Sequence, residues 1–271
     1  MIANPKRQPA IFIPHGGGPC FFMDWTWGPA DTWRKTKRFL EQLHTTLPAP
    51  PKAMVVVSGH WEEPAFTVGA AAAPKLIYDY SGFPAHTYQL SWPAPGDPEL
   101  AERVAGLLEN AGLPSAINRT RGYDHGVFIP LKVAFPEAQI PVVTLSLLHS
   151  LDPQLHLAAG RALAPLREEG VLIVGSGMSF HNLGAYFQPN TLGRSREFDA
   201  WLTSAVESPA QKRDALLDRW RSAPFGAYAH PREEHLLPLM VAAGAGGDAA
   251  GVRIFSDEPM GAASSAFRFD G

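Results

Sequence analysis

The chain has 271 residues, of which 45% are hydrophobic and 18% charged, and its formal net charge is −3 at pH 7. This composition is typical of a globular protein with a sizeable core, and the small charge gives no electrostatic case for binding nucleic acid or an anionic membrane. The single cysteine, Cys20, excludes an internal disulfide and a cysteine-rich zinc site, and no stretch approaches the roughly 20 apolar residues that span a bilayer. We therefore expect a cytoplasmic protein without a signal peptide, folded as one domain over residues 1–271.

Short apolar runs rich in β-branched residues and bounded by proline or glycine recur along the chain. This pattern is typical of strands that are buried on both faces of a parallel sheet. The runs lie at residues 10–13, 53–58, 65–70, 140–147 and 171–176. Near the C-terminus, VRIFSD and SSAFRF predict one or two edge strands.

Segments with helical periodicity separate these runs. They predict helices at 31–46, 98–112, 126–135, 153–168, 193–206 and 210–221, and another that begins at Pro231. Asp31 is expected to cap the first helix, and AAGAGGDAAG at 242–251 is interpreted as a loop of small residues. Strands that alternate with helices predict a three-layer α/β/α sandwich around a largely parallel, mixed central sheet.

Four histidines lie just after predicted strands or near the start of a predicted helix. His15 follows AIFIP, His60 follows VVVSG and His181 lies a few residues beyond VLIVGS, whereas His235 lies in HPREEHLLPLM. In open α/β sheets, ligands bind beyond the carboxyl ends of the strands, so we expect these imidazoles to share one cleft. Imidazole is a common ligand of zinc, iron, copper and nickel. The pattern predicts a metal site suited either to non-haem Fe(II) oxygen chemistry or to a catalytic zinc ion.

Competing motifs are incomplete. The glycines after His15 precede no GK[ST] and form no GxGxxG, which argues against a phosphate-binding loop. Val174 stands where a nucleophile elbow around Ser176 would need glycine, so a serine hydrolase is not indicated. The segment around His235 also lacks the HExxH spacing of zinc proteases.

The sequence does not fix the roles of the remaining histidines or of several aromatic and basic residues. His125, in the sequence DHG, is either a turn residue or a site residue, and His86 lies in an aromatic-rich loop that would line or cover a pocket. His44, His149 and His156 are interpreted as structural or surface residues, and His230 as an N-cap or loop residue. Candidates for stacking on an aromatic ligand, or for core packing, are Trp25, Trp27, Tyr88 and Trp92. No basic residue is assigned to a substrate carboxylate, although three flank the DHG sequence: Arg119, Arg121 and Lys132.

Six motifs in chain order carry a family resemblance: HGGGP, SGHW, GFPxxxY with PAPG, GxDHG, SGxxxHNL and PxxEHLLPL. Together they resemble the class III extradiol ring-cleavage dioxygenases, and most closely the DOPA-dioxygenase branch, which is related to the β subunit of protocatechuate 4,5-dioxygenase. The resemblance extends from about Ala10 to Phe267, nearly the whole chain.

The resemblance implies specific roles for these residues. A divalent metal, normally Fe(II), would be held by His15, His60 and His235. In the protocatechuate branch a glutamate completes the triad, so Glu234 is an alternative third ligand. His181 would be the catalytic base, and in zinc-occupied members also a metal ligand. His125 would contact substrate or oxygen during catalysis.

The activity implied is that of an oxidoreductase in aromatic compound catabolism. It would open the ring of a catechol-type substrate with O₂ to give a semialdehyde acid. The sequence does not decide whether the protein forms a homo-oligomer or needs a second subunit. Two alternatives come from other functional classes. A zinc hydrolase would use the same histidines with Glu233 or Glu234 as base, and a non-catalytic metal or ligand-binding module would need no base at His181.

Overall fold

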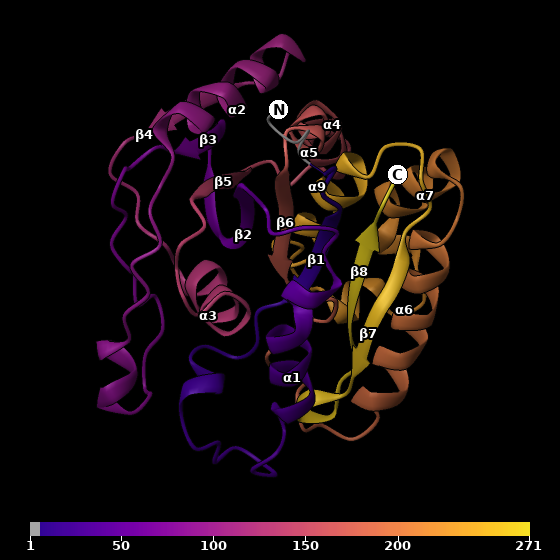
Figure 1. The fold of residues 1–271 in the computed structure, drawn as a ribbon. Coiled ribbons are helices and arrows are strands. Elements are labelled where there is room, and N and C mark those ends of the chain that lie inside the picture. Colours follow the sequence, from indigo (N-terminus) through magenta and orange to yellow (C-terminus); the bar gives the residue numbers. More distant parts are fainter. Residues whose placement is uncertain (1–5) are drawn as a thin grey trace.

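The computed structural model describes residues 6–271, and within them eight strands form one sheet. The strands are β1 (Ala10–Pro14), β2 (Ala53–Glu63), β3 (Phe66–Gly69), β4 (Ser115–Asn118), β5 (Val142–Leu148), β6 (Val171–Gly177), β7 (Val252–Asp257) and β8 (Ser264–Phe269). Their order is β4-β3-β5-β2-β6-β1-β8-β7 (Figure 1). The central strands β5, β2, β6 and β1 are parallel, whereas β3 is antiparallel to β5, and β8 is antiparallel to both β1 and β7. The predicted mixed, largely parallel sheet is confirmed.

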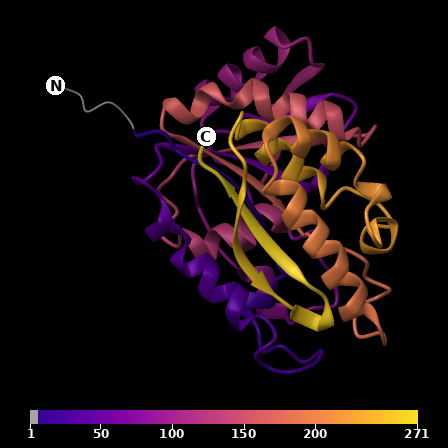
Figure 2. The same cartoon turned by 90° about the vertical axis from the view of Figure 1, so that its right-hand side faces the viewer.

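Helices cover both faces of this sheet. They are α1 (Arg34–Gln42), α2 (Pro98–Asn110), α3 (His125–Ala134), α4 (Pro153–Leu163), α5 (Pro165–Glu168), α6 (Thr191–Val206), α7 (Ala210–Asp218), α8 (Gly226–Ala229) and α9 (Leu237–Ala245). Ile11 and Val56 belong to a core shared with α1 and α3, whereas Phe12 and Val55 point into a second core shared with α2, α4, α6 and α9. Figure 2 shows α1 and α6 on opposite sides of the β7–β8 pair. The three-layer sandwich is therefore also confirmed.

The last helix differs from the prediction in both position and length. Residues 231–236 form a turn, and α9 begins at Leu237 rather than Pro231, so His235 precedes the helix. The helix extends into the segment 242–251, which the sequence suggested was a loop. Alanine favours helix, and the small residues serve packing: a side chain on Gly244 would collide with the Leu157 carbonyl of α4.

Other boundaries shift for local reasons. Helix α1 begins at Arg34 with Trp33 at its N-cap, and Asp31, the predicted cap, instead forms an ion pair with Arg34 at 2.8 Å. The helix predicted at 153–168 is divided because Pro165 has no N–H to continue α4. Helix α7 stops at Asp218, before the predicted end at 221, and a short 3₁₀ turn follows. Strand β4 was not predicted.

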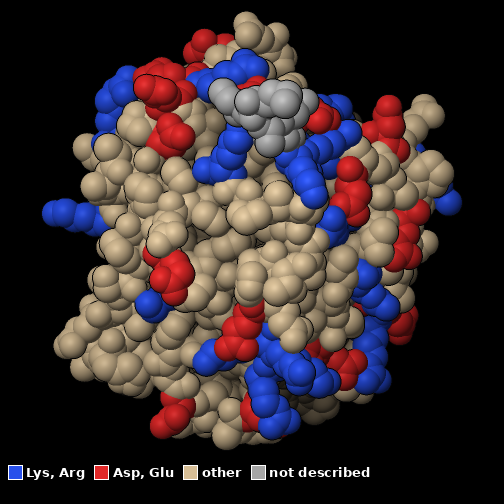
Figure 3. Space-filling model, in the orientation of Figure 1, with Lys and Arg blue, Asp and Glu red and all other residues tan. Residues whose placement is uncertain are grey.

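No helix within residues 6–271 combines the length and apolarity that crossing a membrane requires. On the face shown in Figure 3, acidic and basic side chains are interspersed around the margin, and uncharged residues cover most of the middle.

Arg167 connects three segments at the end of the sheet opposite the histidines. Its side chain is fully buried, and its guanidinium donates to the carbonyl oxygens of Gln8, Ala245, Phe269 and Gly271 at 2.6–3.1 Å. These bonds join the chain before β1, the end of α9, and the end of β8 with the residues that follow it.

We expect Arg167→Met to lower the free energy of unfolding by at least about 3 kcal/mol, because buried carbonyl groups would lose their donors. Arg103→Met is the matched control: Arg103 is half exposed and pairs only with Glu169, so the loss should stay below about 1 kcal/mol. Urea unfolding of both variants measures the difference. Equal stabilities for the two variants would show that the buried hydrogen bonds of Arg167 contribute little to the free energy of unfolding.

Candidate functional site

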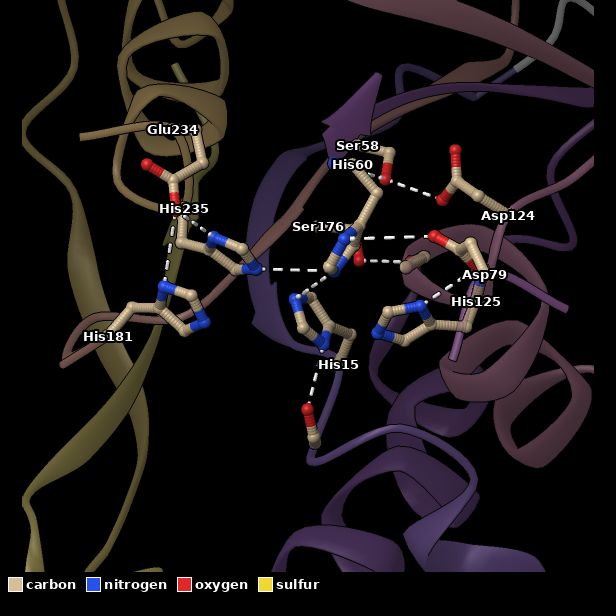
Figure 4. Close-up of polar contacts among 12 residues, drawn as sticks. His15, Ser58, His60, Asp79, Asp124, His125, Ser176, His181, Glu234 and His235 are labelled. Atoms are coloured by element: carbon tan, nitrogen blue, oxygen red, sulfur yellow. Dashed lines mark hydrogen bonds and ion pairs between the residues drawn. The ribbon is translucent and has the colours of Figure 1, made fainter. Parts of the chain in front are cut away.

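Histidines from five segments meet at the carboxyl end of the central strands. His15 directly follows β1, His60 lies near the end of β2, and His181 lies four residues beyond β6. His235 belongs to the turn before α9, and His125 is the first residue of α3. Figure 4 shows their rings turned toward one another. The sequence pattern predicted this convergence for His15, His60, His181 and His235 but left the role of His125 open.

Three of these side chains bring their Nε2 atoms together. His60 Nε2 lies 3.3 Å from His15 Nε2 and 3.2 Å from His235 Nε2. Nδ1 of His15 faces the Gly16 carbonyl at 2.8 Å, and Nδ1 of His235 faces Glu234 Oε1 at 2.9 Å. A carbonyl and a carboxylate only accept hydrogen bonds, so both Nδ1 atoms donate. The Nε2 lone pairs of His15 and His235 therefore point at His60.

This arrangement fits a metal ion. His60 Nε2 carries at most one hydrogen and cannot donate to both neighbours at once, whereas a cation among the three nitrogens would engage every lone pair. Burial lowers the pKa of His15 and His235 far below the usual imidazole range, and that of His60 to about 3, with the neighbouring histidines adding to the effect. Neutral imidazole is the form that coordinates metals. The potential ligand atoms of the three residues all lie within 4.8 Å of one another.

His181 lies beside this cluster and shares a carboxylate with it. Its ring stacks on that of His235, with centroids 3.4 Å apart, and its Nδ1 lies 3.3 Å from Glu234 Oε1. Burial alone would raise the pKa of the Glu234 carboxyl, but the hydrogen bond from His181 and the charge of Arg232 lower it overall. One carboxylate oxygen thus serves two imidazoles, and Nε2 of His181 stays available for chemistry. The structure groups His181 with Glu234 and His235 rather than with His15 and His60.

His125 is held on the other side of the cluster by Asp79. Asp79 Oδ1 accepts from the backbone N of His125 at 2.8 Å and faces its Nδ1 at 2.9 Å, while Oδ2 lies 3.8 Å from His60 Nδ1. Burial alone would raise the pKa of Asp79, but hydrogen bonds from His125 bring it below its usual value. Sequence reasoning missed Asp79. Its only signal was an acidic residue between two tyrosines, three positions before GFP.

Gly126 allows α3 to approach β2. A Cβ at this position would lie 2.5 Å from Ser58 Oγ and 2.8 Å from Cδ2 of His60. Ser58 in turn donates to Asp124 Oδ1 at 2.7 Å, and Ser176 donates to the Gly126 carbonyl. The glycine of DHG thus provides room for His60, and the two serines fix the backbone around it.

We expect Gly126→Ala to displace His60 and to weaken metal binding by roughly 10–100-fold, as loss of a ligand's supporting contacts does. Gly106→Ala is the control, because a Cβ on Gly106 would meet nothing within 4 Å. Competition with a chromophoric chelator measures both affinities. Wild-type affinity in Gly126→Ala would mean that His60 needs no such clearance.

A cavity of about 250 Å³ adjoins the histidines. All five imidazoles line it, together with the glycines of HGGGP and with apolar and aromatic side chains. A larger cavity, of about 580 Å³, runs along α1 but is lined by none of the histidines. The smaller cavity is therefore the one that joins space for a ligand to candidate chemistry.

The other residues singled out from the sequence lie outside this cavity. Trp25 and Trp92 are buried in the core, and Tyr88 packs among aromatic side chains. Lys132 donates to the Ser91 carbonyl, and Arg121 and Arg119 pair with acidic residues. Nε2 of His86 contacts the Phe22 carbonyl at 3.0 Å. His230 is buried after α8, where its Nε2 faces the Ser179 carbonyl.

His156 is a buried structural histidine. Its Nε2 accepts from the Leu148 amide, its Nδ1 donates to the Asp152 carbonyl, and burial lowers its pKa to about 4. Between pH 6.5 and 4 the unfolded chain therefore binds a proton at His156 that the folded chain excludes. The free energy of unfolding consequently decreases as the pH is lowered through this range. We expect this group alone to remove about 2 kcal/mol between pH 7 and pH 5.

Urea unfolding at both pH values tests this expectation. His156→Gln should lose about 2 kcal/mol less than wild type between pH 7 and 5, because glutamine does not titrate. Exposed His44→Gln is the control and should follow wild type. The same pH dependence in all three proteins would contradict the assignment.

Comparison with known proteins places this chain in a family. Residues 9–268 match the model of the catalytic LigB subunit of aromatic ring-opening dioxygenase. The chain is 40% identical to the 4,5-DOPA dioxygenase extradiol of Beta vulgaris over 92% of this chain and 90% of that protein. It is 39% identical to dioxygenase tasH of Hapsidospora irregularis over 93% and 82%, and 33% identical to the 4,5-DOPA dioxygenase extradiol of Escherichia coli over 90% and 88%.

A solved structure agrees with these sequence matches. The crystal structure of an uncharacterized protein from Escherichia coli K12 superposes with a TM-score of 0.78 at 30% identity, covering 97% of this chain and 100% of that one. The chain therefore belongs to the LigB family of aromatic ring-opening dioxygenases, as its six ordered motifs predicted.

Proposed function

We propose that this enzyme is a metal-dependent extradiol dioxygenase that opens the ring of a catechol-type substrate with O₂. The observation that carries the proposal is the convergence of three Nε2 atoms at a cavity that two further histidines also line. The C–C bond beside the diol breaks, and the semialdehyde acid contains all atoms of the catechol and both atoms of O₂. The reaction therefore needs no external reductant.

His15, His60 and His235 would hold the metal, which we propose is Fe(II) in the active form, with Zn(II) able to occupy the same ligands. When bound, Fe(II) supplies Lewis acidity toward the catechol oxygens and the redox capacity that reaction with O₂ needs. We favour His235 over Glu234 as the third ligand, because the Glu234 carboxylate already faces Nδ1 of both His235 and His181.

His181 is proposed as the general base. Glu234 holds its Nδ1, so the ring is oriented and Nε2 is the atom that receives a proton from a catechol hydroxyl. Imidazole exchanges protons near neutral pH, and the resulting cation would lie beside the Glu234 carboxylate. A role for His181 as an additional zinc ligand stays a prediction from the family resemblance.

His125 is proposed to stabilise negative charge that develops on oxygen. Asp79 fixes the ring through Nδ1, and the ring as a cation would donate its Nε2–H into the cavity that it lines. A positioned donor of this kind typically contributes on the order of 10²–10³ in rate.

The hydrolase alternative gains no support from the site. Its candidate bases are both engaged: Glu234 by two imidazoles, and Glu233 by Arg221 at 2.6 Å. Neither glutamate lines the cavity that adjoins the three-histidine cluster.

Anaerobic reconstitution with Fe(II), followed by O₂-uptake measurements with a catechol panel, tests the proposal. The panel includes DOPA, the compound in the names of several relatives. We expect one O₂ to be consumed per catechol, with a yellow ring-opened product. Absence of uptake with every diol, together with ester or amide hydrolysis by the zinc form under anaerobic conditions, would replace the proposal with the hydrolase.

A further inference from the structure

Beyond the histidines, the walls of the 250 Å³ cavity are mostly apolar, and the polar groups among them include the Ser81 hydroxyl and the Trp33 indole, whose buried Nε1 has no hydrogen-bond partner. Trp33, Phe83, Met178, Leu183 and Met260 contribute side chains without charge. Two tyrosines also line the cavity, but both hydroxyls are committed to backbone carbonyls: that of Tyr80 to Thr87 at 2.6 Å, and that of Tyr186 to Phe180 at 2.9 Å. A ligand substituent that extends past the histidines would therefore meet mainly hydrocarbon and aromatic surface.

Within residues 6–271, no lysine, arginine, aspartate or glutamate lines this cavity. Basic side chains of α1, among them Lys37 and Arg38, line the separate 580 Å³ cavity, which shares only Trp33 with it. The flanking carboxylates of Asp79 and Glu234 face the Nδ1 atoms of the histidines. A carboxylate on a substrate would thus find no lysine or arginine there, and an ammonium group no aspartate or glutamate.

Exposed apolar side chains extend this surface outward. Leu183 lines the cavity although 72% of it is exposed, and Trp27, 50% exposed, packs against Phe83 with ring centroids 5.2 Å apart. Phe187, 56% exposed, bonds through its backbone N to the carbonyl of cavity residue Met260 at 3.3 Å. Large apolar side chains exposed together in this way commonly mark a binding surface.

We propose that the catechol opened by this enzyme carries an uncharged, apolar substituent that reaches the rim at Leu183. The inference rests on the proposed function and names the substrate class of the same site. An apolar cavity of about 150 Å³ holds benzene, so 250 Å³ accommodates the ring and a substituent of a few heavy atoms. A charged substituent of that size would lose its water without gaining a lysine, arginine, aspartate or glutamate as a partner.

Three catechols with side chains of similar length test the inference: 4-propylcatechol, 3,4-dihydroxyphenylacetate and dopamine. We expect kcat/KM of the Fe(II) enzyme, from O₂ uptake, to be at least about tenfold higher for 4-propylcatechol than for either charged compound. Dissociation constants, measured without O₂ through quenching of tryptophan fluorescence, should follow the same order. Trp33 lines the cavity and serves as the reporter.

Leu183→Arg tests the position of the substituent. A cation at the rim should pair with the carboxylate of dihydroxyphenylacetate, so the specificity ratio of this acid to 4-propylcatechol should rise by about tenfold or more. Leu183→Gln changes polarity without adding charge, and Val252→Arg adds the same charge to an exposed residue of edge strand β7. Val252→Arg should keep the wild-type ratio, and Leu183→Gln should raise it by less than Leu183→Arg does.

The outcomes separate this inference from the proposed function. Equal or better binding and turnover of a charged catechol would overturn the apolar substrate class while leaving the dioxygenase intact. An unchanged ratio in Leu183→Arg would overturn the placement of the substituent. If no diol consumes O₂, the proposed function fails, and the order of the anaerobic dissociation constants still decides which substituent the cavity selects.

Discussion

His60→Ala is expected to weaken Fe(II) or Zn(II) binding on the order of 10²–10⁴-fold, one ligand's share of the binding free energy of about 10–16 kcal/mol found for zinc sites. His60 is the member of the cluster whose Nε2 contacts both other Nε2 atoms, at 3.3 and 3.2 Å, so its loss leaves two ligands. O₂ uptake should fall to background as a consequence.

Metal content after dialysis and chelator competition measures the effect. His86→Ala is the control: this imidazole is exposed, contacts the Phe22 carbonyl and takes no part in the cluster. Full metal content in His60→Ala would remove His60 from the ligand set, whatever happened to the activity.

His181→Ala is expected to keep the metal and lose the reaction. General acid–base catalysis contributes about 10²–10⁴-fold, so kcat should fall by that factor. The metal affinity should change by less, because His181 contacts the cluster only through its stacking on His235 and through Glu234. Single-turnover O₂ consumption and chelator competition measure the two quantities separately.

If His181→Ala lost metal and activity in parallel, His181 would be identified as a metal ligand. The pH profile provides a second test. Removal of the base should change the shape of the pH profile of kcat, whereas a purely structural role would lower kcat equally at every pH. His149→Ala, a change in an exposed residue after β5, is the control for both measurements.

The architecture was predictable because buried parallel strands have a local signature. Runs such as AIFI and VLIVGS are apolar on both faces, and the parallel strands that follow from them place His15 and His60 at the same end of the sheet. These histidines could be paired from sequence because each follows its apolar run by only a residue or two.

Features that depend on tertiary contacts could not be predicted in this way. The start of α9 is set by packing against α4 and the sheet, and the proline and acidic residues at 231–234 indicated a helix that tertiary contacts replace with a turn. Asp79 lies in an irregular segment 46 positions from His125, and no local pattern connects the two. The choice between Glu234 and His235 depends on which side chain points inward, which periodicity does not specify.

The central claim is that His15, His60 and His235 bind one metal ion. Its most direct test is an anomalous difference map from crystals grown with zinc, in which the ion is redox-inert. We predict a single strong peak about 2.0–2.1 Å from the Nε2 atoms of all three residues. A peak elsewhere, or no peak at full zinc loading, would contradict the account.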